Sequence, residues 1–172
     1  MDYIKRSFEN KFLELNNEYS CLLLVGPRQV GKSTMLEHLM EGTDRRSVTL
    51  DDLEERKLAK NDPKLFLEMH PAPVLIDEIQ YAPELFSYIK IAIDKGAPAG
   101  SYWLTGSQAF RLMELAQESL AGRTAILHMS ALSQSEIYSG KGTSPFTVDL
   151  TELMNRKDGL ASSTATERYE RI

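Results

Sequence analysis

The sequence predicts an α/β fold built on a doubly wound, parallel five-stranded sheet, and three observations support this prediction. Strand-like apolar runs alternate with helix-like segments about five times along the chain, as is typical of parallel strands joined by crossover helices. The apolar run 21–25 leads into a glycine-containing loop that opens a helix over 34–40. The apolar run 74–78 ends in two carboxylates, as expected where a buried parallel strand meets a ligand crevice.

The segment before the first strand predicts a helix over residues 1–20. Its apolar residues recur at spacings of three or four: Ile4, Phe8, Phe12 and Leu15. Residues 45–50 predict the second strand. Asp51 and Asp52 then predict the cap of a helix over 53–59, and we prefer this interpretation of Asp51 to a role facing the ligand.

The middle of the chain predicts two helices, one on each side of the acidic strand. Asp62 is a favourable N-cap and Pro63 suits the first helical position, so a short helix is expected through Met69. Another helix begins at 83–84 with one apolar stripe, which we assign to its core face: Leu85, Phe86, Ile89, Ala92 and Ile93.

The last part of the predicted core contains two more strands, over residues 102–105 and 124–129. A helix that ends near Ala116 separates them. Ser133, followed three residues later by Glu136, matches a capping box and predicts a short helix after the last strand.

These patterns predict a core domain over residues 1–138, including the N-terminal helix. Residues 139–172 change in character, because Ser, Thr, Gly and Lys dominate and apolar positions are scattered. This composition predicts a loop-rich segment. Residues 166–172 begin a helix-like pattern and stop, which predicts a fragment with a truncated C-terminal region.

Length and composition restrict the class of protein. The chain has 172 residues, enough for one domain with a full core. A formal net charge of −5 gives no global attraction to nucleic acid, although a local basic face remains open. No apolar run approaches the length of a membrane span, and the N-terminus lacks an apolar signal core. We therefore expect a cytoplasmic protein that does not enter membranes.

The loop after the first strand matches the phosphate-binding pattern G-x-x-x-x-G-K-[ST] at every fixed position. This loop and the residue after it are the predicted nucleotide-binding set: Gly26, Pro27, Arg28, Gln29, Val30, Gly31, Lys32, Ser33 and Thr34. Backbone N–H groups must approach a polyphosphate closely, which requires glycine where a Cβ would clash or φ is positive. The loop ends at a helix N-terminus, where unpaired N–H groups and the helix dipole favour an anion.

Side chains of the loop and of the acidic strand complete the predicted site. Lys32 supplies a mobile ammonium for the β- and γ-phosphates of ATP. The Ser33 hydroxyl and the Asp77 carboxylate are the predicted groups for Mg²⁺, and Glu78 is the predicted general base that activates water. An apolar run followed by Asp-Glu is a weak signal alone, and the upstream loop strengthens it.

Four segments, 26–33, 74–78, 104–107 and 119–123, resemble the AAA+-like ATPases of bacteria and archaea, which are usually named only as ATP-binding proteins with an AAA domain. The resemblance covers roughly residues 1–138. It implies a P-loop nucleoside triphosphatase fold of the AAA+ (ASCE) type. In that family a helical lid and a large C-terminal domain normally follow the core, and the chain as given lacks their counterparts.

The resemblance also implies roles for polar residues outside the two motifs. Thr105 or Ser107 corresponds to the polar sensor of the γ-phosphate and attacking water, on a strand between the phosphate loop and the acidic strand. Arg123 lies just before the last strand, where AAA+ proteins place the arginine that reaches a neighbouring subunit's nucleotide. This implies a homo-oligomer, and the alternative is an ordinary surface arginine.

The function predicted from these features is ATP binding and Mg²⁺-dependent ATP hydrolysis, coupled to a conformational change in an attached or partner domain. A non-hydrolysing, nucleotide-dependent switch remains an alternative. A small-molecule kinase is less favoured, because Glu78 beside the Mg²⁺-binding acid favours water as the nucleophile and no arginine-rich lid is recognisable.

Overall fold

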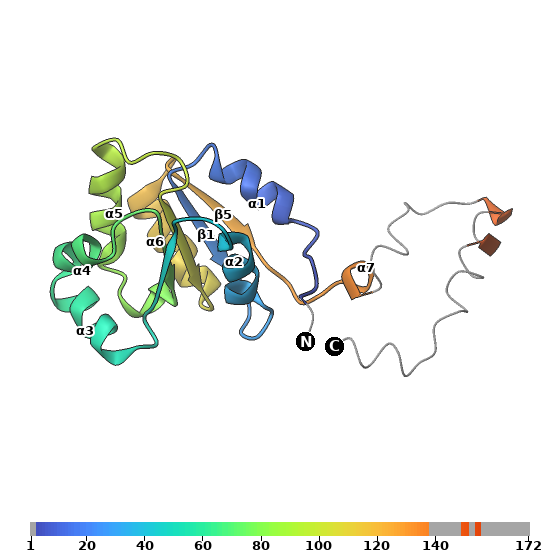
Figure 1. Ribbon diagram of the computed structural model, residues 1–172, viewed down its shortest axis with the longest axis horizontal. Coiled ribbons are helices and arrows are strands. Elements are labelled where there is room, and N and C mark those ends of the chain that lie inside the picture. Colours follow the sequence, from blue (N-terminus) through green and yellow to red (C-terminus); the bar gives the residue numbers. More distant parts are fainter. Residues whose placement is uncertain (1–2, 138–148, 152–153, 156–172) are drawn as a thin grey trace. The chain divides into compact units, whose positions relative to one another are not determined.

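The structure is a computed structural model that describes residues 3–137, 149–151 and 154–155. The chain divides into two compact units, one formed by Phe8–Ala131 and the other by Met1–Ser7 with Leu132–Ile172. The first unit carries the sheet and the predicted phosphate loop (Figure 1). Most of the segment 139–172, with the helix-like pattern at 166–172, lies outside the described residues.

A parallel sheet of five strands forms the centre of the larger unit, as predicted. Its strands are β1 Cys21–Val25, β2 Arg46–Thr49, β3 Val74–Asp77, β4 Tyr102–Gly106 and β5 Thr124–His128. The order is β2-β3-β4-β1-β5, and every neighbouring pair is parallel. Strand β4 therefore lies between β1 and β3, as the family resemblance implied for the strand that carries Thr105. All strands end at the same edge of the sheet, where the phosphate loop follows β1.

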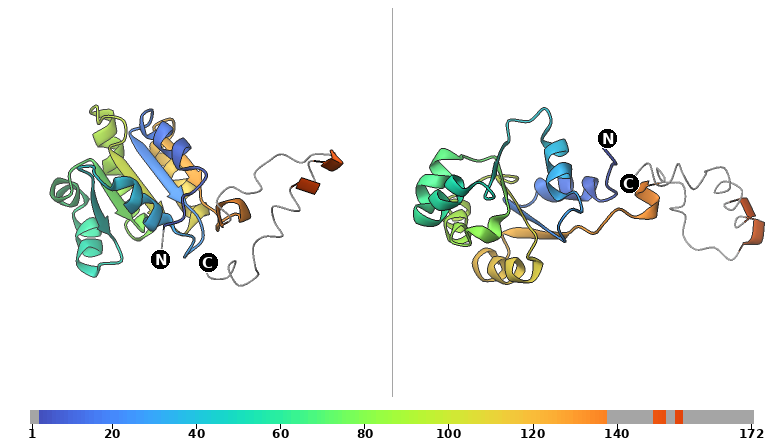
Figure 2. Two further views of the ribbon diagram at one scale, coloured as in Figure 1. Left: turned by 45° about the vertical axis from the view of Figure 1, so that its right-hand side comes forward. Right: turned by 90° about the horizontal axis from the view of Figure 1, so that it is seen from below.

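Helices cover both faces of the sheet (Figures 1 and 2). They are α1 Glu9–Asn16, α2 Lys32–Met40, α3 Leu53–Asn61, α4 Pro63–Met69, α5 Leu85–Asp94 and α6 Ala109–Leu120, with a short 3₁₀ helix η1 at Ile79–Tyr81. The smaller unit contains α7 Gln134–Ile137. Among the residues that the structure describes, no helix is both long and apolar enough to cross a membrane.

Side chains alternate between the two faces of each central strand, because successive residues of a strand point to opposite sides. On β1, Leu23 joins the apolar cluster that includes Phe66 of α4 and Phe86 of α5. On the other face, Phe12 of α1 packs edge-on against Trp103 of β4, with ring centroids 4.9 Å apart. Both faces are therefore buried, which explains the continuous apolar runs in the sequence.

Helix α1 is shorter than the predicted helix over 1–20. It begins only at Glu9, because the backbone N–H of Ser7 donates to the Glu136 carboxylate at 2.7 Å and is not available to a continuous helix. It ends at Asn16, and the chain then joins the sheet: the Gly100 N–H donates to the Tyr19 carbonyl oxygen at 2.8 Å. Tertiary hydrogen bonds therefore override the local apolar periodicity.

The caps of the short helices follow the sequence signals, with one correction. Asp52 caps α3 and accepts from the backbone N–H groups of Glu54 and Glu55 at 2.8 and 3.2 Å. Asp51 is not part of the cap, so our preference for capping at this residue was wrong. Asp62 caps α4 as predicted, with Pro63 at the first helical position.

The predicted capping box forms in the smaller unit. Ser133 and Glu136 exchange hydrogen bonds, with the Ser133 N–H donating to Glu136 Oε2 at 2.8 Å. Burial by itself would raise the pKa of Glu136, but hydrogen bonds from Ser7, Ser133 and Arg6 outweigh it and lower the pKa to about 2. The carboxylate therefore stays charged and ties the N-terminal segment to α7.

Replacing Asp62 by alanine should destabilise the chain through loss of the α4 cap. The Asp62 carboxylate accepts from the Leu65 backbone N–H at 2.9 Å, and removing such an acceptor costs about 1 kcal/mol of unfolding free energy. Urea unfolding of Asp62→Ala measures this loss. The matched variant Asp62→Asn retains an acceptor and should remain within a few tenths of a kcal/mol of the parent. Equal losses in both variants would show that the cap is not the cause.

Candidate functional site

The phosphate loop leaves β1 beneath the backbone that follows β5. A Cβ on Gly26 would overlap the carbonyl oxygen of Met129, and the Met129 N–H donates to the Val25 carbonyl at 2.8 Å. At the other end of the loop, Gly31 adopts φ +90° as the N-cap of α2, a conformation that favours glycine. Both fixed glycines of the motif are therefore required by the backbone, as the sequence predicted.

Lys32 is buried within the loop that it follows. Its ammonium donates to the carbonyl oxygens of Pro27 at 2.8 Å and Gly26 at 3.1 Å, and only 6% of the residue is exposed. Burial lowers the pKa of Lys32, while the charges of Glu78 and Asp77 act in the opposite direction. A buried ammonium at the N-terminus of a helix provides a strong attraction for an anionic group.

The Asp77 carboxylate joins three elements at the end of β3. The Ser33 hydroxyl of α2 donates to Asp77 Oδ2 at 3.1 Å, and the fully buried Thr105 hydroxyl of β4 donates to Oδ1. The backbone N–H of Glu78 also donates to Oδ1, at 3.1 Å. The predicted pair for Mg²⁺, Ser33 and Asp77, is therefore assembled in direct contact.

Glu78 follows Asp77 in an unusual backbone conformation, with φ +57°. Such a conformation costs a non-glycine residue about 1 kcal/mol or more, and it occurs where the surroundings impose it. Its carboxylate accepts a hydrogen bond from the side-chain amide of Gln80. The same amide group donates to the Ser107 hydroxyl at 3.3 Å. Of the two candidate sensors, Thr105 therefore contacts the acid Asp77, and Ser107 is linked to Glu78 through Gln80.

The sequence analysis missed Gln80. It is 6% exposed, and its Oε1 has no hydrogen-bond partner among the described residues. A Cβ on Gly106 would overlap both this amide oxygen and Leu112, so the glycine at the end of β4 makes room for Gln80. Gln80 stands two residues after Glu78, with Ile79 between them, and no motif or periodic pattern in the sequence marked it.

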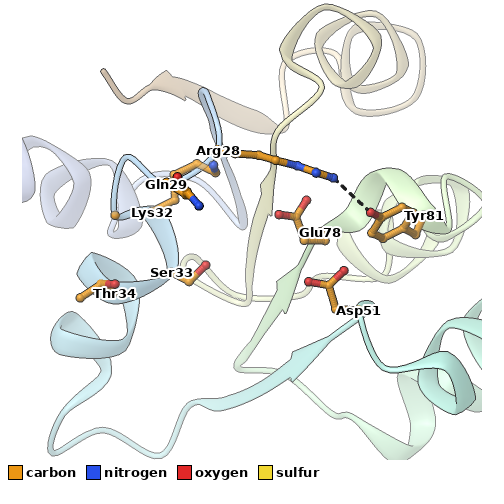
Figure 3. Close-up of a pocket in the computed structure, with 9 residues that line it drawn as sticks. Arg28, Gln29, Lys32, Ser33, Thr34, Asp51, Glu78 and Tyr81 are labelled. Carbon is orange, nitrogen blue, oxygen red and sulfur yellow. Dashed lines mark hydrogen bonds between the residues drawn. The ribbon is translucent and has the colours of Figure 1, made fainter. Parts of the chain in front are cut away.

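These groups line a cavity of about 630 Å³ at the carboxyl end of the sheet (Figure 3). Its lining residues are Arg28, Gln29, Gly31, Lys32, Ser33, Thr34, Asp51, Glu78 and Tyr81. Most of the predicted nucleotide-binding set lies on this surface. Gly26, Pro27 and Val30 are not part of the lining. The carbonyl oxygens of Gly26 and Pro27 instead accept hydrogen bonds from the Lys32 ammonium. Asp77, Thr105 and Ser107 are not among the lining residues. Asp77 contacts the lining residue Ser33, Thr105 contacts Asp77, and Ser107 contacts Gln80.

The wall opposite the loop was not predicted. The guanidinium of Arg56 stacks on the Tyr81 ring, 3.8 Å from its centroid, and its Nε donates to the Leu50 carbonyl at 2.6 Å. Asp51 lies 3.6 Å from the same guanidinium and lines the cavity. Arg28 reaches across from the loop and donates to the Tyr81 hydroxyl at 3.5 Å.

The structure does not bring Arg123 to this cavity. Arg123 precedes β5, whose first residue pairs with Cys21 at the beginning of β1, whereas the phosphate loop follows the end of β1. At about 3.3 Å per residue, the length of the strand separates them. The Arg123 guanidinium instead donates to Asp94 at 2.6 Å and is partly exposed. Arg123 therefore does not reach the cavity of its own chain, and the predicted role across an interface stays a prediction.

The strand–loop–helix element, the acid on a neighbouring strand and the strand order together define an ATPase-like, nucleotide-binding protein of the P-loop class. Residues 18–138 match the protein family described as "AAA domain". This match spans well over half of the chain, so the chain belongs to that family. The family resemblance inferred from the motifs is confirmed.

The chain is also similar to individual proteins and to a solved structure. Uncharacterized proteins of Mycobacterium tuberculosis and Mycobacterium bovis are each 33% identical to the chain over 121 residues, which is 69% of this chain. The matched segment is 26% of either relative, so the chain spans about a quarter of their length. The fold is similar to that of a Walker-type ATPase of Pyrococcus abyssi, with a TM-score of 0.60 and 17% identity, over 99% of this chain and 66% of that one.

Replacing Gly26 by alanine should destabilise the chain before any ligand is added. The new methyl group would overlap the Met129 carbonyl, and such overpacking costs about 1–3 kcal/mol of unfolding free energy. Thermal or urea unfolding without nucleotide measures the loss. Gly42 is the control, because it has φ +76° and nothing within 4 Å of the position of a Cβ. Gly42→Ala should cost less, and an equal or larger loss there would contradict the packing argument.

Proposed function

We propose that this chain binds ATP with Mg²⁺ and hydrolyses it to ADP and inorganic phosphate. The observation that carries the proposal is the contact of Ser33 with Asp77 at 3.1 Å, directly beside Glu78 and Lys32 in one cavity. Membership of the AAA domain family and the similarity in fold to a Walker-type ATPase support it.

The residues present fit both the phosphates and the metal. The cradle at Gly26 leaves no room for a side chain, and Gly31 opens α2 so that the N–H groups of its first turn are available to an anion. Ser33 and Asp77 supply oxygen atoms, which are the donors that Mg²⁺ prefers. Bound Mg²⁺ would neutralise charge on the phosphate oxygens.

In the proposed reaction, water attacks the γ-phosphorus and the bond from that phosphorus to the β–γ bridging oxygen breaks. Glu78 accepts the proton of the attacking water, and the bridging oxygen leaves with ADP. Lys32 binds phosphate oxygens and stabilises the charge that develops on them. The Gln80 amide holds Oε2 of Glu78, so Oε1 is the atom left to orient the water. The Thr105 hydroxyl donates to the Asp77 carboxylate and so orients it toward Ser33.

Turnover in a longer protein would act on an attached domain or a partner. The curated relatives are about four times as long as the matched segment, which supports a further region whose conformation responds to the nucleotide. We propose that Arg123 contributes from a neighbouring copy, since it lies away from its own cavity and is partly exposed. A cytoplasmic location is proposed with this function.

A non-hydrolysing switch is the second candidate, and the hydrogen bond from Gln80 to Glu78 favours it. If that contact persists when ATP is bound and keeps Oε1 away from the attacking water, the carboxylate cannot act as a base. The chain would then change conformation on binding without breaking the nucleotide. A small-molecule kinase, the weaker rival, would require a phosphate acceptor in place of water.

Glu78→Gln should lower the rate of phosphate release by about 10²–10⁴-fold, because the amide cannot accept the proton of water. The dissociation constant for Mg²⁺-ATP should stay within a few-fold of that of the parent. Phosphate release and nucleotide titration measure the two effects. Glu118→Gln on the exposed part of α6 is the matched control and should leave both unchanged. ATP binding by the parent chain without phosphate release would favour the switch, and equal rates in parent and Glu78→Gln would remove Glu78 as the base.

Mixing Arg123→Ala chains with Glu78→Gln chains should recover hydrolysis that neither variant shows alone. A shared site would combine the intact Glu78 of one copy with the intact Arg123 of another, and such arginines raise turnover by about 10³-fold or more. Phosphate release across a range of mixing ratios measures the recovery. A mixture no more active than the average of its components would exclude a trans role for Arg123.

A further inference from the structure

We infer that Arg28, in the phosphate loop, is a catalytic residue that stabilises the transferring γ-phosphoryl group within its own chain. The inference rests on the proposed ATP hydrolysis and goes beyond general nucleotide binding by the loop. It assigns the arginine contribution inside the cavity to a residue other than Arg123, which lies outside it.

The path of the Arg28 side chain is the first observation. Arg28 leaves the loop after β1 and extends across the cavity, and the dashed line in Figure 3 marks its contact with Tyr81 on the far side. Its terminal nitrogen donates to the Tyr81 hydroxyl at 3.5 Å. Tyr81 is the last residue of the 3₁₀ helix that Glu78 caps. The guanidinium therefore lies on the side of the cavity where the base is, whereas the Lys32 ammonium lies within the loop.

The charges that line the cavity are the second observation. Arg28 and Lys32 are the two basic side chains among the lining residues. Glu78 and Asp51 are the carboxylates among the lining residues, and Asp51 lies 3.6 Å from Arg56. Lys32 lies at the loop and the Arg28 guanidinium lies near Tyr81, so cationic groups stand on two sides of the cavity. A polyphosphate bound in the cavity could contact both cations.

The support beneath Arg28 is the third observation. Arg56 stacks on the Tyr81 ring at 3.8 Å and is itself fixed to the Leu50 carbonyl at 2.6 Å. This stacking restricts the position of the Tyr81 ring and therefore of its hydroxyl. The contact from Arg28 to the Tyr81 hydroxyl, at 3.5 Å, is longer than an ordinary hydrogen bond of about 2.7–3.2 Å, so it is weak and leaves the other N–H groups of the guanidinium to bind a ligand.

The chemistry of a guanidinium suits this place. It presents a planar fork of N–H donors that matches phosphoryl oxygens, and it cannot be deprotonated under ordinary conditions. Negative charge spreads over the equatorial oxygens of the γ-phosphoryl group in the transition state. Arg28 donates hydrogen bonds to those oxygens and exchanges no proton, so the proton of the attacking water still goes to Glu78.

The test compares Arg28→Ala and Arg28→Lys with the parent chain, and Arg111→Ala on an exposed part of α6 is the matched control. Binding of a fluorescent ADP analogue with Mg²⁺ is measured with and without aluminium fluoride, which completes a planar mimic of the transferring group. Arg28→Ala should bind ADP within about threefold of the parent but lose about a hundredfold or more in affinity for the aluminium fluoride complex. Its kcat should fall by a similar factor. Arg28→Lys should recover only part of either loss, because a lysine is a point charge.

A mixing experiment then distinguishes a cis arginine from a trans one. Arg28→Ala mixed with Glu78→Gln should show no recovery of phosphate release, because the copy with an intact base would still lack its own Arg28. Recovery in that mixture would overturn the inference. Unchanged kcat and unchanged fluoride-complex affinity in Arg28→Ala would also overturn it.

Failure of the proposed hydrolysis and failure of the role of Arg28 give different results. A parent chain that binds the ADP analogue but never releases phosphate from ATP would contradict the proposed hydrolysis, and with it this inference. A parent chain that hydrolyses ATP only as fast as Arg28→Ala does would contradict the inference alone. Arg28 is exposed, so its substitutions should leave the fold intact, and retained ADP binding verifies this. Tyr81→Phe provides an independent variant and should lower kcat several-fold with little change in ADP binding.

Discussion

The Asp77 carboxylate is the constraint on which the arrangement of the site depends. Ser33 of α2 and Thr105 of β4 donate to its two oxygens, so one side chain fixes the phosphate-loop helix relative to two strands. Hydrogen bonds to an ionised carboxylate are among the stronger ones in proteins. If this carboxylate moved, Ser33 would lose its partner, and Glu78, whose backbone N–H donates to the same group, would lose its orientation.

The surrounding residues carry local costs that this anchor helps to offset. Gln29 and Glu78 both adopt positive φ, Lys32 is buried with a lowered pKa, and Gln80 has an amide oxygen without a partner among the described residues. Unfavourable features of this kind are expected at sites that bind or transform ligands, where the fold supplies the compensation. In this chain they are concentrated at the carboxyl end of the sheet, around one cavity.

Local signals predicted much of this structure. The strands were recognisable because both faces of the sheet are buried, and the glycines because the backbone at Gly26 and Gly31 accepts no other residue without cost. Asp62 was recognisable as a cap because it acts on its own helix. Each of these signals occupies a short stretch of sequence, although the steric reason at Gly26 is the distant Met129 carbonyl.

Long-range contacts account for what was missed. The helix over 1–20 failed because Ser7 binds Glu136, far along the chain. Asp51 was assigned to a cap because it stands beside Asp52 just before α3, whereas its carboxylate lies 3.6 Å from the Arg56 guanidinium. Gln80 and Tyr81 follow the acidic pair in a short 3₁₀ helix, and no periodic pattern indicates that their side chains meet Glu78 and Arg28. The contact of Gln80 with Glu78 is local but accompanies the unusual positive φ of Glu78, and the contact of Tyr81 with Arg28 joins distant segments. Neither has a recognisable pattern in the sequence.

Calorimetric titration of the chain with ATP, once with Mg²⁺ and once with a chelator, tests the central claim most directly. The account predicts saturable binding of about one nucleotide per chain, weakened when Mg²⁺ is removed, because Ser33 and Asp77 are then left without the metal that links them to the phosphates. Absence of binding heat under both conditions, confirmed by an unchanged thermal midpoint at millimolar ATP, would contradict it.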